Sequence, residues 1–319
     1  MPNIALVHSH EPTIYNEIAR HTPDGFDTVG IDVRKTLDEQ IALAASTEYL
    51  ILSGTKLPDE VLKASGPRLL QILSAGWDFL NSSLISELEI PVANNGGANS
   101  WAVSDHTMLL LLAVYHRLVE ADASTRSGNW GAPLDGMNAF ELAGKTVGVL
   151  GIGNIGRQVA KRLRAFDAEV QYHDVYRLTG EQEQTLGLTY VGIEELFETS
   201  DAITVHVPLV PQTHHLVSRE LLGLMKPTAV IVNTSRGALI DEAALIDTLG
   251  NNRIAGAGLD VFEIEPVEPD NPLLKMPQVI VTPHSAGNNW DAWSRRAAFG
   301  YANVARVQRG EAPLGLISF

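Results

Sequence analysis

Residues 146–156 have the sequence TVGVLGIGNIG, and residues 169–174 have the sequence EVQYHD. Each segment begins with a short run of strand type, and a helical pattern of apolar residues lies between them. One face of that predicted helix carries Val159, Leu163 and Phe166. A strand, a glycine-rich turn, a helix and a second strand ending at Asp174 form a dinucleotide-binding unit in the required order. The stretch therefore predicts an α/β fold that binds a dinucleotide.

The three glycines of the turn have distinct tasks in such a unit. Gly151 permits the tight turn, Gly153 lets the backbone approach a pyrophosphate, and Gly156 lets the helix pack close to the strand. The N-terminus of the helix then presents free N–H groups and its positive dipole end to the phosphates. Asp174 lies 18 residues after Gly156 (174 − 156), where its carboxylate can accept hydrogen bonds from both ribose hydroxyls.

The acid at this position also indicates which dinucleotide binds. NADP carries a phosphate on the ribose oxygen that Asp174 would bind, and a carboxylate repels that phosphate. Arg177 could turn toward a phosphate, but we interpret it as a solvated surface charge. We therefore expect NAD as the cofactor, with NADP less favoured.

The composition of the chain excludes several classes of protein. Its 319 residues, 45% of them hydrophobic, suffice for two domains. A net charge of −15 repels nucleic acids and anionic lipids, so we expect neither as a partner. The absence of cysteine excludes disulfides and thiolate chemistry. We expect a cytoplasmic protein, because no signal peptide is evident and the longest apolar run, 108–115, cannot span a bilayer.

Runs of strand type alternate with helical patterns along the chain. In the first part, the predicted strands are Ile4–Val7, Tyr49–Leu52, Leu69–Leu73 and Pro91–Ala93. In the second part, they are Val147–Leu150, Val170–His173, Ala202–Val207, Ala229–Asn233, Gly258–Val261 and Val279–Thr282. This alternation predicts parallel sheets. We expect two doubly wound α/β domains, a Rossmann NAD-binding domain and a flavodoxin-like substrate domain, with a cleft between them.

Two helical patterns lie where the chain passes from one predicted domain to the other. One is apolar around most of its circumference, covers residues 100–118, and precedes a loop or arm at residues 127–133. The other starts near Trp290 and should cross back to pack on the first domain, although Trp290 and Trp293 could instead line the substrate pocket. The predicted ranges are 1–98 with 288–319 for the substrate domain, and 99–287 for the NAD-binding domain.

Three residues that follow the last three predicted strands could perform chemistry. They are Arg236, Glu265 and His284, and the carboxyl ends of parallel strands bring them to the edge that carries the glycine turn. His284 can take the hydroxyl proton of an alcohol, while Glu265 holds its tautomer and stabilises the imidazolium. Arg236 can bind a substrate carboxylate through two parallel hydrogen bonds. Singly, each is more often a surface or capping group; together they predict a catalytic set.

The segments around these residues resemble those of the D-isomer-specific 2-hydroxyacid dehydrogenase family, of the glyoxylate/hydroxypyruvate reductase type. The similar segments are SAGWD from Ser74, NGGANSWAVSDH from Asn95, HVPL from His206, NTSRGALIDE from Asn233, GLDVFEIEP from Gly258 and TPHSAG from Thr282. With the glycine turn, they cover nearly the whole chain in the expected order.

The resemblance implies a role for each site residue. Arg236 would bind the substrate carboxylate, His284 would be the acid/base, and Glu265 would orient it. The backbone around Ala75 and Gly76 would bind the same carboxylate from the other domain. The implied enzyme is an NAD-dependent oxidoreductase that transfers a hydride between the nicotinamide and C2 of a small 2-hydroxy or 2-keto acid.

The resemblance also implies further cofactor contacts and an assembly. Asp260 would lie near the nicotinamide amide, and residues 100–145 would form a homodimer. The remaining implied cofactor contacts are Asn154, Ile155, Val207, Pro208, Thr213, Thr234, Ser235 and Gly287.

Some branches of the family fit less well. Formate dehydrogenases carry glutamine at the position of Glu265, and phosphite dehydrogenases place a lysine in the loop at 74–76. Glyoxylate, hydroxypyruvate, pyruvate and larger 2-ketoacids all stay open as substrates. The alternative function is an NAD-sensing scaffold like the C-terminal-binding protein corepressors, although this chain has no evident tail for that role.

We expect no metal site. His214 and His215 are adjacent, adjacent histidines usually point apart, and no carboxylate or cysteine cluster supports them, which favours a surface turn. His106, on the long helical pattern, is interpreted as a satisfied interior group.

Overall fold

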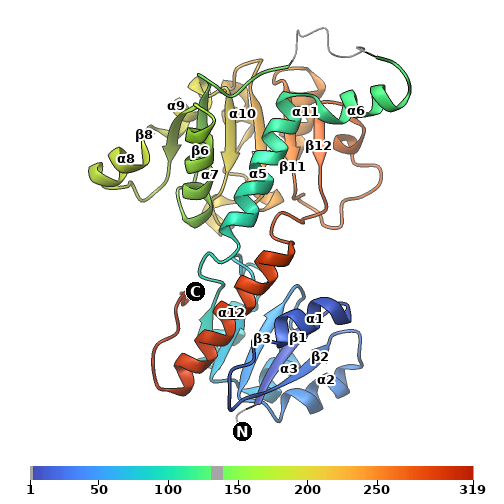
Figure 1. Cartoon of the computed structure of the whole chain (residues 1–319), viewed down its shortest axis with the longest axis vertical. Coiled ribbons are helices and arrows are strands. Elements are labelled where there is room, and N and C mark those ends of the chain that lie inside the picture. Colours follow the sequence, from blue (N-terminus) through green and yellow to red (C-terminus); the bar gives the residue numbers. More distant parts are fainter. Residues whose placement is uncertain (1–2, 131–138, 319) are drawn as a thin grey trace. The chain divides into compact units, whose positions relative to one another are not determined.

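The computed structural model describes residues 3–130 and 139–318, which divide into two compact units. Unit 1 comprises residues 1–99 and 288–319, and unit 2 comprises residues 100–287 (Figure 1). Helix α12 (Trp290–Gln308) packs against the first helix and the fourth strand of unit 1, so the end of the chain joins that unit. The assignment of the substrate to unit 1 and of the cofactor to unit 2 stays a prediction.

Unit 1 is a parallel sheet with helices on both faces. Its strands are β1 (Asn3–His8), β2 (Asp27–Asp32), β3 (Tyr49–Ser53), β4 (Leu69–Ile72) and β5 (Val92–Ala93), in the order β2-β1-β3-β4-β5. Besides α12, its helices are α1 (Pro12–Ala19), α2 (Leu37–Ala44), α3 (Asp59–Ser65) and α4 (Ser82–Glu87). This strand order is the flavodoxin-like one. Alternate residues of each strand pack on α1 and α12 or on α2, α3 and α4.

Unit 2 is a seven-stranded parallel sheet of Rossmann order. Its strands are β6 (Thr146–Leu150), β7 (Glu169–His173), β8 (Leu188–Tyr190), β9 (Ala202–Val205), β10 (Val230–Asn233), β11 (Gly256–Leu259) and β12 (Val279–Val281). The spatial order is β12-β11-β10-β9-β6-β7-β8, so the direction of winding reverses between β6 and β9. In such sheets the ligand binds at this reversal, outside the carboxyl ends of the strands.

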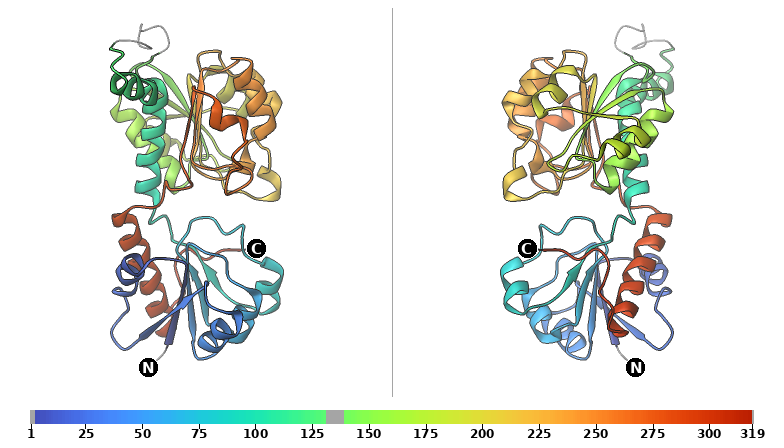
Figure 2. Two further views of the ribbon diagram at one scale, coloured as in Figure 1. Left: turned by 90° about the vertical axis from the view of Figure 1, so that its right-hand side faces the viewer. Right: turned by 90° about the vertical axis from the view of Figure 1, so that its left-hand side faces the viewer.

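Helices cover both faces of the unit 2 sheet (Figure 2). They are α5 (Ser100–Tyr115), α6 (Leu118–Arg126), α7 (Asn154–Ala165), α8 (Gly180–Leu186), α9 (Ile193–Thr199), α10 (Arg219–Leu224) and α11 (Glu242–Gly250), with short 3-10 turns at Pro211–Thr213, Gly237–Leu239 and Pro272–Lys275. Val230 and Val232 pack in the cluster with α5 and α7, whereas Ile231 packs with α9, α10 and α11. The inner strands β6, β9 and β10 are buried on both faces, which explains why they are mostly apolar.

Side-chain caps explain where several helices begin. Thr36 and Glu39 form a reciprocal capping box at α2, and the Asp241 carboxylate accepts from the N–H of Ala244 at the start of α11. The side-chain oxygen of Asn289 accepts from the N–H of Ala292 at the start of α12. Each cap satisfies an N–H group that the helix itself leaves without a partner.

The predicted α/β class and parallel sheets are confirmed, with four corrections to the elements. Strands β2 and β8 were not predicted, because both are edge strands without a continuous apolar run. The helical pattern over 100–118 breaks after Tyr115, where Arg117 adopts a left-handed backbone. Strands β9 and β11 end at Val205 and Leu259, each two residues before the predicted end. Phe166 lies beyond α7 and is 46% exposed, so it does not share the buried face of Val159 and Leu163.

Two predicted segments include residues that the structure does not describe. The predicted arm at 127–133 lies partly outside the described residues, as does part of the predicted dimer segment 100–145. In the ranges that are described, none of the helices has both the length and the apolar character needed to cross a membrane.

Candidate active site

The glycine turn after β6 is packed so tightly that two of its positions exclude any side chain. Gly151 has φ +94°, and a Cβ there would lie 2.8 Å from the carbonyl carbon of His206. A Cβ at Gly156 would lie 2.0 Å from the carbonyl oxygen of Gly151. At Gly153, in contrast, a Cβ would meet no atom within 4 Å. The open direction at Gly153, at the uncapped N-terminus of α7, leaves room for a pyrophosphate.

This contrast predicts different consequences for two alanine substitutions. Gly156→Ala should lower the melting temperature, because its Cβ overlaps backbone that cannot move without opening the turn. Gly153→Ala should leave the melting temperature unchanged and weaken NADH binding, because its methyl group points into open space. Thermal denaturation and NADH fluorescence titration of both variants check this; equal stability losses would contradict it.

Asp174 is placed to serve both the turn and a ribose. One carboxylate oxygen accepts from the N–H of Ile152 at 2.8 Å, and the other accepts from the N–H of Tyr176 at 2.9 Å. A carboxylate has about four lone-pair sites, so these two bonds leave acceptor capacity for hydroxyl groups. The acid therefore links the end of β7 to the glycine turn.

Arg177 is exposed, in keeping with the sequence interpretation as a surface charge, and it is also ion-paired. Its guanidinium donates to both carboxylate oxygens of Glu183, at 2.9 and 3.1 Å, and lies over the ring of Tyr190. Tyr172 also donates its hydroxyl to Glu183 at 2.8 Å. The cation next to Asp174 is thus held by a bidentate ion pair.

His206, at the end of β9, was missed as a candidate residue although its segment was singled out. Both ring nitrogens are inaccessible, and neither has a hydrogen-bond partner among the described residues. Burial lowers the pKa of His206 to about 3, so the ring is neutral at physiological pH. Buried polar atoms without partners are rare, and the backbone of His206 lies beside the glycine turn, where a Cβ at Gly151 would meet it. Together with the open side of Gly153, they fit a bound nicotinamide dinucleotide.

The loop after β10 is folded by its own side chains. Asn233 accepts from the N–H of Ser235 at 3.0 Å and donates to the carbonyl of Arg236 at 2.8 Å. Ser235 donates its hydroxyl to the carbonyl of Val205. Gly237 is a further residue that sequence reasoning missed, since a Cβ there would lie 1.9 Å from the carbonyl carbon of Phe262. This close approach presses the loop of Arg236 against the loop that carries Glu265.

Glu265 and His284 form a direct pair. The distance between Glu265 Oε2 and His284 Nδ1 is 2.6 Å, and Glu265 Oε1 accepts from the N–H of Phe262 at 3.0 Å. Burial acts to raise the pKa of Glu265, but the hydrogen bonds from His284 and Phe262 and the charges of His284 and Arg236 hold it below its usual value. Glu265 is therefore a carboxylate at neutral pH, with the three residues grouped at one edge of unit 2.

Asp260 fixes the loop of His284. This fully buried carboxylate accepts from the hydroxyl of Thr282 and from the N–H groups of Ser285 and Ala286, at 2.5 to 2.9 Å. His284 itself has φ +51° and donates its N–H to the carbonyl of Asp260 at 2.7 Å. A left-handed conformation of this kind is strained and persists only where its surroundings impose it.

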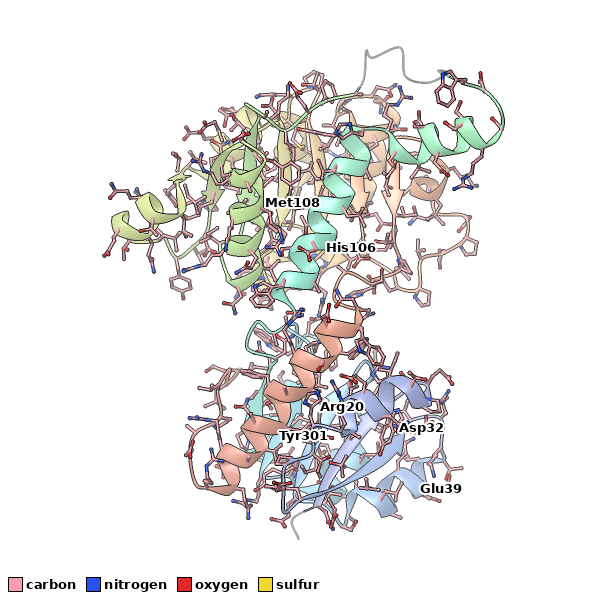
Figure 3. The ribbon with its side chains drawn as sticks, in the orientation of Figure 1. Arg20, Asp32, Glu39, His106, Met108 and Tyr301 are labelled. Atoms are coloured by element: carbon pink, nitrogen blue, oxygen red, sulfur yellow. The ribbon has the colours of Figure 1, made fainter. Side chains whose placement is uncertain are left out.

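His106 on α5 supports the same loop from the helix (Figure 3). Its Nε2 lies 2.9 Å from the hydroxyl oxygen of Thr282. The interpretation of His106 as a satisfied group is therefore confirmed. The neighbouring residue Thr107 makes a buried hydroxyl contact of 2.9 Å with Thr234, one of the predicted cofactor contacts.

The other predicted contacts lie at several places in unit 2, and their roles stay predictions. Asn154 and Ile155 begin α7, Thr213 ends a 3-10 turn, and Val207, Pro208 and Gly287 lie in loops. Thr213 accepts from the N–H of Val210 at 2.9 Å and donates to the carbonyl of Pro208 at 2.7 Å. In unit 1, the loop of Ala75 and Gly76 is held through its carbonyls, which accept from Asn94 at 3.2 Å and from Ser74 at 2.8 Å.

The adjacent histidines lie in a turn, as predicted, but two arguments behind that prediction do not hold. The ring centroids of His214 and His215 lie 4.0 Å apart, and Glu263 approaches His215 Nε2 at 2.5 Å. The rings do not point apart because His215 has a left-handed backbone, with φ +52°. The carboxylate was missed because it is 48 residues away in sequence.

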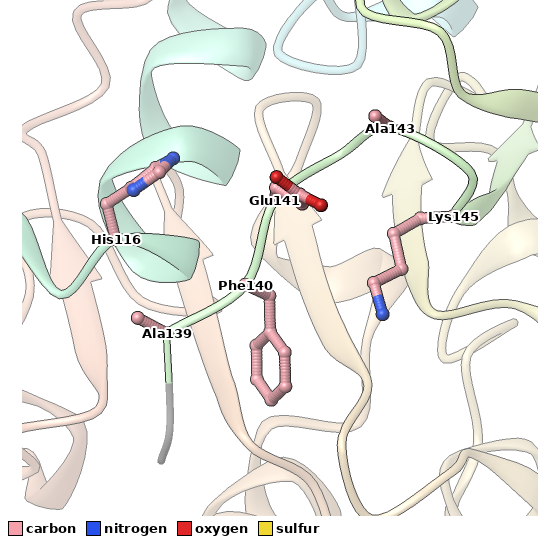
Figure 4. A pocket seen from close by; sticks show the side chains of 6 residues that line it. All are labelled: His116, Ala139, Phe140, Glu141, Ala143 and Lys145. Carbon is pink, nitrogen blue, oxygen red and sulfur yellow. The ribbon is translucent and has the colours of Figure 1, made fainter. Parts of the chain in front are cut away.

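A hollow of about 460 Å³ lies elsewhere on unit 2 (Figure 4). It is lined by His116, Ala139, Phe140, Glu141, Ala143 and Lys145. Lys145 directly precedes β6, so the hollow is at the amino end of that strand. The grouped Arg236, Glu265 and His284 follow the carboxyl ends of strands, where ligands of such sheets bind.

Comparison with known proteins identifies the family. Residues 108–286, more than half of the chain, match the D-isomer specific 2-hydroxyacid dehydrogenase, NAD binding domain. The chain belongs to the D-isomer-specific 2-hydroxyacid dehydrogenase family. This confirms the family that the sequence motifs predicted.

Named members of the family are similar over most of the chain. A glyoxylate reductase from Korarchaeum cryptofilum is 38% identical over 79% of this chain and 76% of that protein. A D-3-phosphoglycerate dehydrogenase from Methanocaldococcus jannaschii is 38% identical over 86% of this chain and 52% of that protein. The structure of an NADPH-dependent glyoxylate/hydroxypyruvate reductase from Sinorhizobium meliloti, with NADP and malonate, has a TM-score of 0.82 at 30% identity, covering 99% of this chain and 97% of that one. The family therefore supports NAD(P)-dependent 2-hydroxyacid reductase activity.

Proposed function

We propose that the protein reversibly reduces a small 2-ketoacid to the 2-hydroxy acid with NADH, with His284 as acid/base, Glu265 as its orienting partner and Arg236 as the carboxylate anchor. The observation that carries this proposal is the 2.6 Å contact between Glu265 and His284, whose loop Asp260 anchors through hydrogen bonds. A cytoplasmic location is part of the same proposal.

The residues divide the work of the reaction. A bound nicotinamide supplies the hydride in reduction and accepts it in oxidation. Arg236 binds the carboxylate of the substrate, and its charge polarises the adjacent carbonyl. His284 gives a proton to the carbonyl oxygen in reduction and removes it in oxidation, while Glu265 holds Nδ1 so that Nε2 faces the substrate.

Activity with a panel of 2-ketoacids tests the proposal. NADH and NADPH oxidation should be followed with glyoxylate, hydroxypyruvate, pyruvate and larger 2-ketoacids. Steady turnover on at least one of them is the expected result. Tight NADH binding without turnover on any would instead favour the scaffold function of the corepressor relatives.

We propose NAD rather than NADP as the preferred cofactor. The carboxylate of Asp174 would repel a 2′-phosphate, and Arg177, the cation that could compensate, is bound by Glu183 through two hydrogen bonds. A 2′-phosphate would therefore have to compete with Glu183 for this guanidinium. The S. meliloti relative is NADPH-dependent, so membership of the family does not decide between the two cofactors. The preference for NAD is therefore argued from Asp174, Arg177 and Glu183 of this chain.

Releasing Arg177 should shift the cofactor preference. Asp174→Asn removes the negative charge and keeps an oxygen for the N–H of Ile152, and adding Glu183→Gln frees the guanidinium. We expect the double variant to raise the ratio of kcat/KM for NADPH over NADH at least about tenfold above Asp174→Asn alone. Asp174→Asn with Glu181→Gln is the matched control, since Glu181 is an exposed acid of the same helix. An equal gain in the control would contradict the role of Glu183.

We also propose a homodimer that uses α5 and α6. Large apolar side chains on these helices and just after them are exposed. They are Trp101, Leu109, Leu118, Val119 and Trp130. Several exposed large apolar side chains on neighbouring helices support an interaction surface there. Sedimentation analysis should give twice the chain mass of 34.5 kDa, and a monomer at micromolar concentration would contradict it.

A further inference from the structure

We propose that His214, His215 and Glu263 form a binding site for a divalent transition metal such as Zn²⁺. One nitrogen of each histidine and one oxygen of the carboxylate lie within 4.8 Å of one another. Two imidazoles and one carboxylate are a donor set that zinc uses in proteins, with a fourth position left for water. None of the three is a proposed catalytic residue, although Glu263 precedes Glu265 by two positions in the same loop, and the proposal does not depend on the proposed function.

The backbone holds the two histidines in this arrangement. His214 follows the 3-10 turn Pro211–Thr213 and donates its N–H to the carbonyl of Val210. His215 donates its N–H to the carbonyl of Ala238 at 2.8 Å. Its left-handed conformation turns its ring toward that of His214, with an angle of 31° between the rings. The pairing is therefore a property of the loop and not only of one side-chain rotamer.

Glu263 comes from a different loop that is also anchored. Its N–H donates to the carboxylate of Glu242 at 2.9 Å, and Glu242 also accepts from the side chain of Asn271 at 2.8 Å. The close approach of Gly237 to Phe262 further limits this loop. Two anchored loops thus present the three donors together before any ion binds.

The spacing and the exposure suit zinc. Tetrahedral zinc with bonds of about 2.0–2.1 Å holds its ligand atoms roughly 3.3 Å apart. The donor atoms are now between 2.5 and 4.8 Å apart, a range that includes this value. The side chains of His215 and Glu263 are 37% and 34% exposed, so a hydrated ion can reach them. Magnesium and calcium prefer oxygen ligands and should not bind.

Calorimetric titration of the full chain with ZnCl₂ tests the proposal, after any affinity tag is removed and the protein is treated with chelator. We expect one equivalent of Zn²⁺ to bind at micromolar concentration or tighter. His214→Ala and Glu263→Gln should each bind at least about tenfold more weakly. His116→Ala, which removes an exposed histidine of the same unit, should bind as the wild type does. MgCl₂ should give no binding heat.

Cobalt absorption gives a second readout of the same ligands. Co²⁺ in the wild-type protein should show the intense visible bands of four coordination, and His214→Ala should lose them while keeping the wild-type melting temperature. The proposal fails if the wild-type protein binds Zn²⁺ no more tightly than His214→Ala and Glu263→Gln. It also fails if His116→Ala weakens binding as much as they do.

Discussion

Replacing Arg236 with alanine should lower kcat/KM for the best 2-ketoacid by between about 30-fold and several thousand-fold. The loss of a guanidinium that binds a carboxylate through two hydrogen bonds costs about 2–5 kcal/mol, and each 1.4 kcal/mol is about tenfold. Asn233 and Gly237 fix the backbone on either side of Arg236, so other side chains cannot easily replace it. Steady-state kinetics with NADH measure the effect.

Two further variants separate recognition from general effects. Arg236→Lys keeps the charge but not the planar pair of donors, so its loss should lie between those of the wild type and Arg236→Ala. Arg253→Ala removes an exposed arginine of the same unit and should leave kcat/KM unchanged. An Arg236→Ala protein with wild-type catalytic efficiency would overturn the anchor assignment.

Replacing His284 with glutamine should lower kcat by about 10²- to 10⁴-fold, the usual contribution of a positioned acid/base. NADH binding, followed by fluorescence, should be retained, because the residue acts on the substrate oxygen. A similar loss of NADH binding would mean that the substitution had disturbed the loop held by Asp260. His116→Gln, away from the grouped residues, is the control.

The pH dependence of the wild-type enzyme gives an independent check. Reduction needs His284 protonated and oxidation needs it neutral, so kcat/KM for reduction should fall with rising pH while that for oxidation rises. The pKa of Glu265 is held below its usual value, so Glu265 stays ionised through the neutral range and does not cause these changes. Identical flat profiles in the two directions would exclude His284 as the proton carrier.

Much of the candidate site could be predicted because its determinants are local in the sequence. The spacing of Gly151, Gly153 and Gly156 reflects steric limits within one turn, and the structure shows the overlap that a side chain would cause at two of these positions. Arg236 follows the buried strand β10, and His284 follows the apolar edge strand β12, so strand prediction alone brings them to the same edge of the sheet. Edge strands β2 and β8 lack a buried apolar run, which is why they were missed.

Other features depend on residues that meet only after folding. The ion pair of Arg177 with Glu183 gives a defined partner to a residue that the sequence indicated was a surface charge. Gly237 is required only because Phe262 arrives from another loop, and no pattern around Gly237 indicates that approach.

The amino-acid sequence by itself determined the α/β class, the dinucleotide turn and the residue types of the catalytic set, because strand periodicity and glycine spacing act over a few residues. Only the tertiary structure decided how loops from different strands meet, including the contact of His215 with Glu263 and the hold of Asp260 on the His284 loop. Those contacts arise from strand order and from the conformation of each loop. Both are set by packing of the whole unit and not by neighbours in the chain.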